Sequence, residues 1–149
     1  MAQSCVIPGV DQILDTMICL TRPMPLQRVI AAGSNGMALY LGLRRRGFIR
    51  TTMPALCHDK RARHGIGLIA GRIESCDSSV DTERDLERIS AFLSVNAGLA
   101  LLVGSGQNGV NIRRKLEQLG FRVEAGVRCS HGLVLSASRQ GYQQMASAA

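Results

Sequence analysis

The sequence predicts an α/β domain of three layers, in which helices cover both faces of a mostly parallel sheet and the chain closes with an antiparallel hairpin. Two stretches predict the parallel part, because each passes from a short apolar strand through a glycine-rich turn into a helix. The first is Arg28–Gly36 with a helix ending at Gly47, and the second is Leu99–Gly109 with a helix ending at Gly120. Strands that alternate with helices need crossover connections, which place the strands parallel and the helices on both faces.

Length and composition suit a globular domain. The chain has 149 residues, and we expect all of them to form one domain, with an N-terminal arm over residues 1–8 and a C-terminal tail over residues 140–149. Hydrophobic residues make up 46% and charged residues 19%, a balance that excludes a disordered chain. Apolar runs such as Leu99–Val103 are far shorter than the ~20 residues that cross a bilayer. No basic residue precedes Arg22, so no secretory signal is predicted and a cytoplasmic protein is expected.

The first third of the chain predicts two helices and one strand. A helix is expected over Gly9–Leu20, because apolar residues recur there at the spacing of one helix face. Two prolines in the segment Thr21–Pro25 cannot continue that helix. A strand follows over Arg28–Ala32, and then a helix over Asn35–Arg46 that stops at the glycine in position 47, a residue suited to a left-handed cap.

The middle of the chain is less regular. A modest strand is predicted over Phe48–Met53, an irregular segment over residues 54–65 and a further strand over Ile66–Ile73. A helix is expected to start near Thr82, whose hydroxyl would cap it while the carboxylate of Asp85 reaches back. Its buried stripe is expected to consist of Leu86, Ile89 and Leu93.

The last third predicts the centre and the end of the sheet. Leu99–Val103 is a continuous apolar run, as expected of a strand buried on both faces. A helix follows over Val110–Leu119. The strands Phe121–Val127 and Leu133–Ser138 are separated by a short polar link, which predicts an antiparallel hairpin.

Both glycine-rich turns are candidate ligand sites. Amide groups at the start of a helix favour an anionic or polar ligand, and glycine lets that ligand approach the backbone. The second turn, Gly104–Gly109, has the spacing G-x-G-x-x-G, and Glu124 lies 20 residues after Gly104, as in a dinucleotide-binding fingerprint. Only 40 residues follow Gly109 and they end in a hairpin, whereas a dinucleotide fold needs further parallel units. A nicotinamide-binding protein is therefore the third choice, and a structural turn is favoured.

The order of elements resembles the class I S-adenosylmethionine-dependent methyltransferases, a family with a Rossmann-like fold. The resemblance covers residues 9–139 and is most specific at Leu116–Glu124 followed by His131–Ala137, which look like the last helix and closing hairpin of that family. It implies a three-layer Rossmann-like sandwich. It also implies that S-adenosylmethionine is the cofactor.

The resemblance implies where that cofactor would bind. The first glycine-rich turn of the family approaches the amino-acid end of the cofactor, which assigns that role here to Gly33, Ser34, Asn35 and Gly36. The family usually has an acidic residue for the ribose at the end of its second strand, where this chain has Thr51-Thr52-Met53, and the first carboxylate after it is Asp59. Gly71 and Arg72 would lie near the pocket after the third predicted strand. No methyl acceptor and no catalytic residue are implied.

Cys57-His58-Asp59 is a local cluster that could carry chemistry. His58 could act as a general base and Cys57 as a nucleophile or a metal ligand. No spacing of the histidines and cysteines matches a tetrahedral zinc site, so no metal is predicted. The alternative is a polar surface loop. The chain has five scattered cysteines without a Cys-x-x-Cys pair, which is typical of reduced thiols.

The chain carries a formal net charge of +7, which could attract an anionic or nucleic-acid partner. Solvated helix faces and pairing with the helix dipole explain the first basic run, Arg44–Arg46, without a partner, and this explanation is favoured. The candidate contacts are Arg44, Arg45, Arg46, Lys60, Arg61 and Arg63.

The sequence therefore favours a methyltransferase-like protein that binds S-adenosylmethionine at the turn Gly33–Gly36, with an unknown acceptor. The alternative is a non-catalytic module that uses the same fold to bind a nucleotide or a partner.

Overall fold

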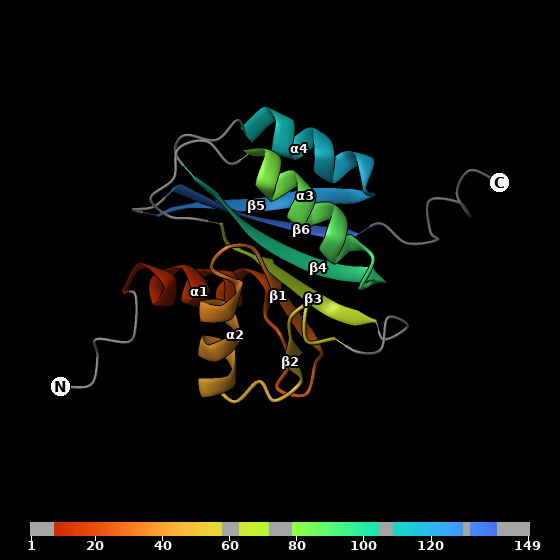
Figure 1. Ribbon diagram of the computed structural model, residues 1–149. Coiled ribbons are helices and arrows are strands. Elements are labelled where there is room, and N and C mark those ends of the chain that lie inside the picture. The colour runs from red at the N-terminus through yellow and green to blue at the C-terminus, as the bar shows by residue number, and fades with distance from the viewer. Residues whose placement is uncertain (1–7, 58–62, 72–78, 105–108, 130–131, 140–149) are drawn as a thin grey trace.

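The computed structural model describes residues 8–57, 63–71, 79–104, 109–129 and 132–139 (Figure 1). Helices and strands alternate along the chain until a closing pair of strands. The elements are α1 (Pro8–Thr21), β1 (Val29–Ala32), α2 (Gly36–Arg45), β2 (Thr51–Thr52), β3 (His64–Ile69), α3 (Ser79–Ser90), β4 (Leu93–Gly104), α4 (Gly109–Gln118), β5 (Phe121–Cys129) and β6 (Gly132–Arg139).

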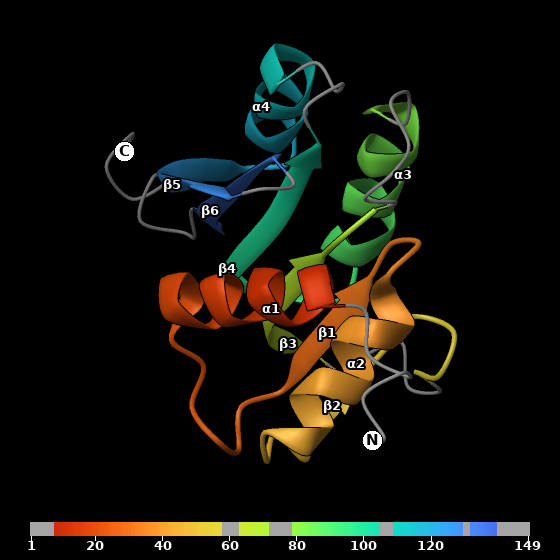
Figure 2. The same cartoon turned by 90° about the vertical axis from the view of Figure 1, so that its left-hand side faces the viewer.

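The strands form one sheet in the order β2-β1-β3-β4-β6-β5. The first four strands in that order are parallel to their neighbours, while β6 is antiparallel to both β4 and β5. Helices α1 and α2 lie on one face of the sheet, and α3 and α4 lie on the other (Figures 1 and 2). The predicted three-layer architecture with an antiparallel end is confirmed.

Two apolar clusters, one on each face of the sheet, form the core. In β1, Val29 and Ala31 belong to the cluster under α1 and α2, while Ile30 and Ala32 belong to the cluster under α3 and α4. Successive side chains of a strand point to opposite faces, so a strand buried on both sides has no polar positions. This is the physical reason for the uninterrupted apolar runs that predicted the central strands.

The start of α3 differs from the prediction. The helix begins at Ser79, and Thr82 lies within it at 2% exposure, so the expected cap at Thr82 is wrong. Leu93, expected on the same helix, instead opens β4 and pairs in register with His64. An apolar residue four positions after another fits a helix stripe and a following buried strand equally well, so periodicity could not separate them.

The second strand is shorter than predicted. Residues 48–50 extend the turn that ends α2: the Phe48 amide donates to the Leu43 carbonyl (3.1 Å), and the Arg44 guanidinium donates to the Ile49 carbonyl (3.1 Å). Only Thr51–Thr52 pairs with β1. The third predicted strand is confirmed in its centre, but it begins two residues earlier, at His64, and ends at Ile69.

Close packing of the β1–α2 turn on β3 holds the carboxyl ends of these strands together. Gly33 has φ +99°, a left-handed conformation that glycine adopts without strain. A Cβ atom at this position would lie 2.3 Å from the carbonyl oxygen of Ala70, just beyond β3. Only glycine allows the two backbone segments to approach this closely.

We predict that Gly33→Ala lowers the free energy of unfolding by about 3 kcal/mol or more, since backbone strain and a collision with a carbonyl oxygen both contribute. Gly47→Ala is the matched control, because Gly47 has φ +93° but nothing within 4 Å of the added Cβ. The control should lose only about 1 kcal/mol of unfolding free energy, because backbone strain is then the sole cost. Denaturant unfolding of both variants measures the difference, and equal losses would contradict the importance of the Gly33–Ala70 contact.

Candidate functional site

The predicted cofactor turn lies where the connections of the sheet diverge. Strand β1 leads through α2, on one face, to β2 on its outer side, whereas β3 is followed by α3 on the other face and by β4 on the inner side. Ligands of open α/β sheets bind at such a switch point, beyond the carboxyl ends of the strands. The turn Gly33–Asn35 and the segment Ala70–Gly71 meet there.

Four of the predicted site residues contact one another. The Asn35 side-chain amide donates to the carbonyl of Gly71 (2.6 Å), and the Asn35 backbone amide donates to the carbonyl of Ala70 (3.0 Å). The Gly36 amide donates to the carbonyl of Gly33 (2.9 Å), which closes the turn. These bonds occupy two of the amides that were expected to face a ligand.

Ser34 stands at the exposed tip of the turn. No hydrogen bond from its amide or hydroxyl to another described residue is recorded. A Cβ on Gly36 would meet Ala31 and Met53 at 3.7–3.8 Å, an ordinary contact, so Gly36 is not required by packing. Ser34 is therefore the residue of this turn that is best placed to face a ligand.

The end of β2 offers no carboxylate among the described residues that follow it, 53–57. The side chain of Met53 instead packs near the start of α2. Asp59, expected to hold the ribose, and Arg72, expected near the pocket, both lie outside the described residues, as does His58. Their predicted roles stay predictions.

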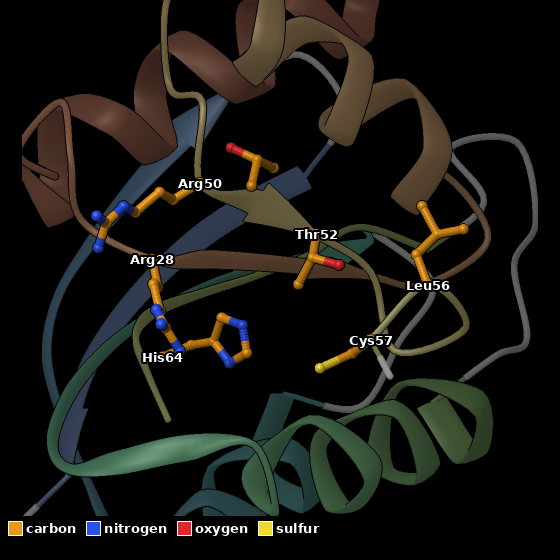
Figure 3. Close-up of a pocket in the computed structure, with 7 residues that line it drawn as sticks. Arg28, Arg50, Thr52, Leu56, Cys57 and His64 are labelled. Atoms are coloured by element: carbon orange, nitrogen blue, oxygen red, sulfur yellow. The ribbon is translucent and has the colours of Figure 1, made fainter. Parts of the chain in front are cut away.

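A second candidate site lies at the opposite edge of the sheet. A cavity of about 500 Å³ opens beside the amino ends of β1, β2 and β3 (Figure 3). Arg28 and Arg50 directly precede β1 and β2, and His64 is the first residue of β3. Residues of the turn after β2 line the other side of this open cavity. The complete lining is Arg28, Arg50, Thr51, Thr52, Leu56, Cys57 and His64.

His64 is held in a defined orientation in this cavity. It is 3% exposed, its Nδ1 atom lies 3.1 Å from the carbonyl oxygen of Phe92, and its ring packs edge-on against the Phe92 ring. Burial lowers the pKa of His64; the hydrogen bond to Phe92 opposes this shift, and the positive charge of Arg28 adds to it. A neutral imidazole that donates from Nδ1 leaves Nε2 as an acceptor. Sequence reasoning placed His64 in an irregular loop and weighed it only as a possible metal ligand, which was not favoured.

The predicted basic surface is partly used within the molecule. The guanidinium of Arg46 pairs with the carboxylates of Asp15 (2.9 Å) and Asp11 (3.6 Å), which joins α2 to α1. Arg44 lies over the ring of Tyr40, and Arg63 donates to the carbonyl of Ala91 (3.2 Å). Arg45 is exposed, and Lys60 and Arg61 lie outside the described residues. Internal pairing accounts for several of these charges without a partner.

The second glycine-rich turn does not gain support from Glu124. Residues 105–108 of the turn lie outside the described residues, but Gly104, at the end of β4, and Glu124, in β5, are both described. The Ser138 hydroxyl donates to the Glu124 carboxylate (3.0 Å), and Ser138 pairs with Gly98, in the middle of β4 and six residues before Gly104. At about 3.3 Å per residue, Gly98 and Gly104 are about 20 Å apart. Glu124 is thus not positioned to hold a ribose bound at that turn.

The described residues include neither a metal-ligand cluster nor a membrane-spanning helix. No group of three or more histidine, cysteine, aspartate or glutamate side chains among them could hold a metal ion. None of the described helices is both long and apolar enough to cross a membrane.

Known structures share this architecture at low sequence identity. No protein-family model matches the sequence, and no curated protein shows significant sequence similarity. The release factor-specific protein-(glutamine-N5) methyltransferase of Alicyclobacillus acidocaldarius matches with a TM-score of 0.58 and 17% identity, over 90% of this chain and 93% of that one. A 1,6-didemethyltoxoflavin-N1-methyltransferase of Burkholderia thailandensis was solved with S-adenosylhomocysteine. It matches with a TM-score of 0.55 and 15% identity, over 89% of this chain and 80% of that one.

A putative hemolysin of Lactococcus lactis matches with a TM-score of 0.61 and 10% identity, over 91% of this chain and 89% of that one. The chain therefore has the class I S-adenosylmethionine-dependent methyltransferase-like fold. Because the identities are low, the shared fold does not by itself assign a reaction.

We predict that His64 makes the folded protein less stable as the pH is lowered. Its pKa is below 6.5 in the folded protein and near 6.5 in the unfolded one, so the unfolded state binds the proton first. Stability is then fully present above pH 6.5 and is lost as the pH falls through 6.5 toward the folded pKa. Unfolding of the wild type and His64→Gln between about pH 8 and pH 5 measures this, and the variant should show the shallower slope. Parallel curves would exclude His64 as the source.

Proposed function

We propose that this protein binds S-adenosylmethionine at the turn Gly33–Gly36 and is methyltransferase-like in function, with an unidentified acceptor. The observation that carries the proposal is the position of this turn. It stands at the switch point of the sheet, between two strands whose following helices lie on opposite faces. Similar folds are found in methyltransferases, one of them solved with S-adenosylhomocysteine.

The residues at the turn fit the amino-acid end of this cofactor in part. Ser34 is exposed there, and the left-handed Gly33 lets the turn pack closely against Ala70. Asn35 fixes the turn to Gly71, so the site is preorganised by the chain itself. The cofactor would supply an electrophilic methyl group. The role of these residues would be to bind and orient it, because methyl transfer depends mainly on positioning.

A specific observation also favours a second candidate, a non-catalytic module with the same fold. Two amides of the turn are already bonded to Ala70 and Gly33, and residues 53–57 after β2 include no carboxylate for a ribose. Both features reduce the interactions that a bound nucleoside could gain. Weak or absent cofactor binding is the property that distinguishes this candidate.

Calorimetry with S-adenosylmethionine, S-adenosylhomocysteine and NAD tests the proposal on the full chain. We expect the first two to bind, and we expect Ser34→Tyr to weaken them about tenfold or more by overlap with the ligand. Because Ser34 is exposed, this change should leave the unfolding free energy nearly unchanged. Leu41→Tyr, at a position 45% exposed further along α2, is the matched control and should bind normally.

Each other outcome has a definite meaning. If neither adenosyl compound binds, the cofactor proposal fails and the non-catalytic module is favoured. Binding that survives Ser34→Tyr would place the ligand elsewhere. Binding of NAD alone would favour the nicotinamide interpretation of Gly104–Gly109.

A further inference from the structure

The cavity at the amino edge of the sheet is lined by two arginines and a histidine. Val29 pairs in register with Thr51, so the residues before them, Arg28 and Arg50, stand on adjacent strands. The Val29 amide donates to the Arg50 carbonyl (3.2 Å), which fixes the two backbones side by side. Like charges at neighbouring positions of adjacent strands destabilise a sheet.

No carboxylate of the described residues forms an ion pair with either guanidinium. The ion pairs that the described chain does form use Arg46 and Lys115 on other elements. His64 adds a third group that can become positive, and it lies beside Arg28 in Figure 3. An anion in this cavity would remove the repulsion, because it can accept hydrogen bonds from both guanidinium groups.

The rest of the lining suits the same kind of ligand. The Thr52 hydroxyl has only a 3.4 Å contact with the Met53 carbonyl, so it can donate to a ligand oxygen, whereas the Thr51 hydroxyl is committed to Phe48 (2.7 Å). Leu56 supplies an apolar wall on the other side of the cavity, where Figure 3 shows it apart from the arginines. The site thus has one cationic and one apolar side.

We propose that this cavity binds a small molecule bearing a phosphate group, held by Arg28 and Arg50 with Thr52 and His64 beside them. A volume of about 500 Å³ lies within the range of small-molecule sites, and Leu56 offers an apolar surface for further atoms of the ligand. The site is at the opposite edge of the sheet from the turn Gly33–Gly36. It does not depend on whether S-adenosylmethionine binds there.

Titration with inorganic phosphate at low salt, followed by ³¹P NMR and calorimetry, tests the site on the full chain. We expect Arg28→Gln and Arg50→Gln each to weaken phosphate binding about tenfold, the equivalent of one strong charge-assisted hydrogen bond. Arg45→Gln removes the same charge from the exposed end of α2 and is the matched control, with binding unchanged. The NMR resonance of His64 is assigned as the histidine signal that is absent from His64→Gln. In the wild type this resonance should report a raised imidazole pKa when phosphate is bound.

Thermal unfolding supplies a readout that does not depend on affinity. Without phosphate, Arg50→Gln should unfold at a slightly higher temperature than the wild type, since the repulsion between Arg28 and Arg50 is relieved. With phosphate, only the wild type and Arg45→Gln should gain stability. Equal weakening by all three arginine variants would reduce the effect to general attraction by the net charge and overturn the site. Tighter binding of acetate or succinate than of phosphate would overturn the phosphate assignment. If the arginine variants lose phosphate binding but the His64 resonance of the wild type does not respond to phosphate, this cavity is excluded as the site.

Discussion

The contact between Gly33 and Ala70 is the constraint on which the rest of this structure depends. It sets the separation of the β1–α2 turn from the end of β3, and the two hydrogen bonds from Asn35 to Ala70 and Gly71 then follow from that separation. Helix α2 starts directly after the turn, so the same contact fixes where its first amides lie. A side chain at position 33 would separate β1 from β3 at the edge where a ligand is expected.

This constraint has two consequences that act in opposite directions on binding. A turn tied to its neighbour is rigid, and a rigid site loses little conformational entropy when a ligand binds. The bonds that make it rigid, however, use amides that a ligand would otherwise receive. Ser34, at the tip, keeps its exposure because the tied residues are those on either side of it. The proposed binding at this edge would therefore depend on one exposed residue more than on the glycine pattern as a whole.

The sequence predicted the features that depend on local backbone chemistry and failed where distant segments meet. Gly47 has the positive φ expected of a helix cap, and the apolar run Leu99–Val103 forms the buried centre of β4, because both depend on neighbouring residues. The capping role of Thr82 was wrong because the helix already begins at Ser79, which places Thr82 inside it with a buried side chain. The amino-edge cavity could not be predicted, since Arg28 and Arg50 become neighbours only through the register of β1 and β2. A signal was present in the arginine that precedes each strand, but it is meaningful only once the strands are known to pair.

The two edges of the sheet offer ligands different kinds of interaction. At the carboxyl edge, helix starts present main-chain amides, so an anionic group can be held without charged side chains. At the amino edge, helices end, and their last carbonyls carry partial negative charge. The Arg46 guanidinium donates to one of these in α2, the carbonyl of Gly42, while the Arg44 guanidinium donates to the Ile49 carbonyl in the turn that follows the helix. An anion at this edge must therefore be held by side chains such as Arg28 and Arg50, and its binding must weaken with added salt more than binding at the turn. The six residues of β3 separate the edges by about 20 Å, so the two sites share a sheet but no ligand contact.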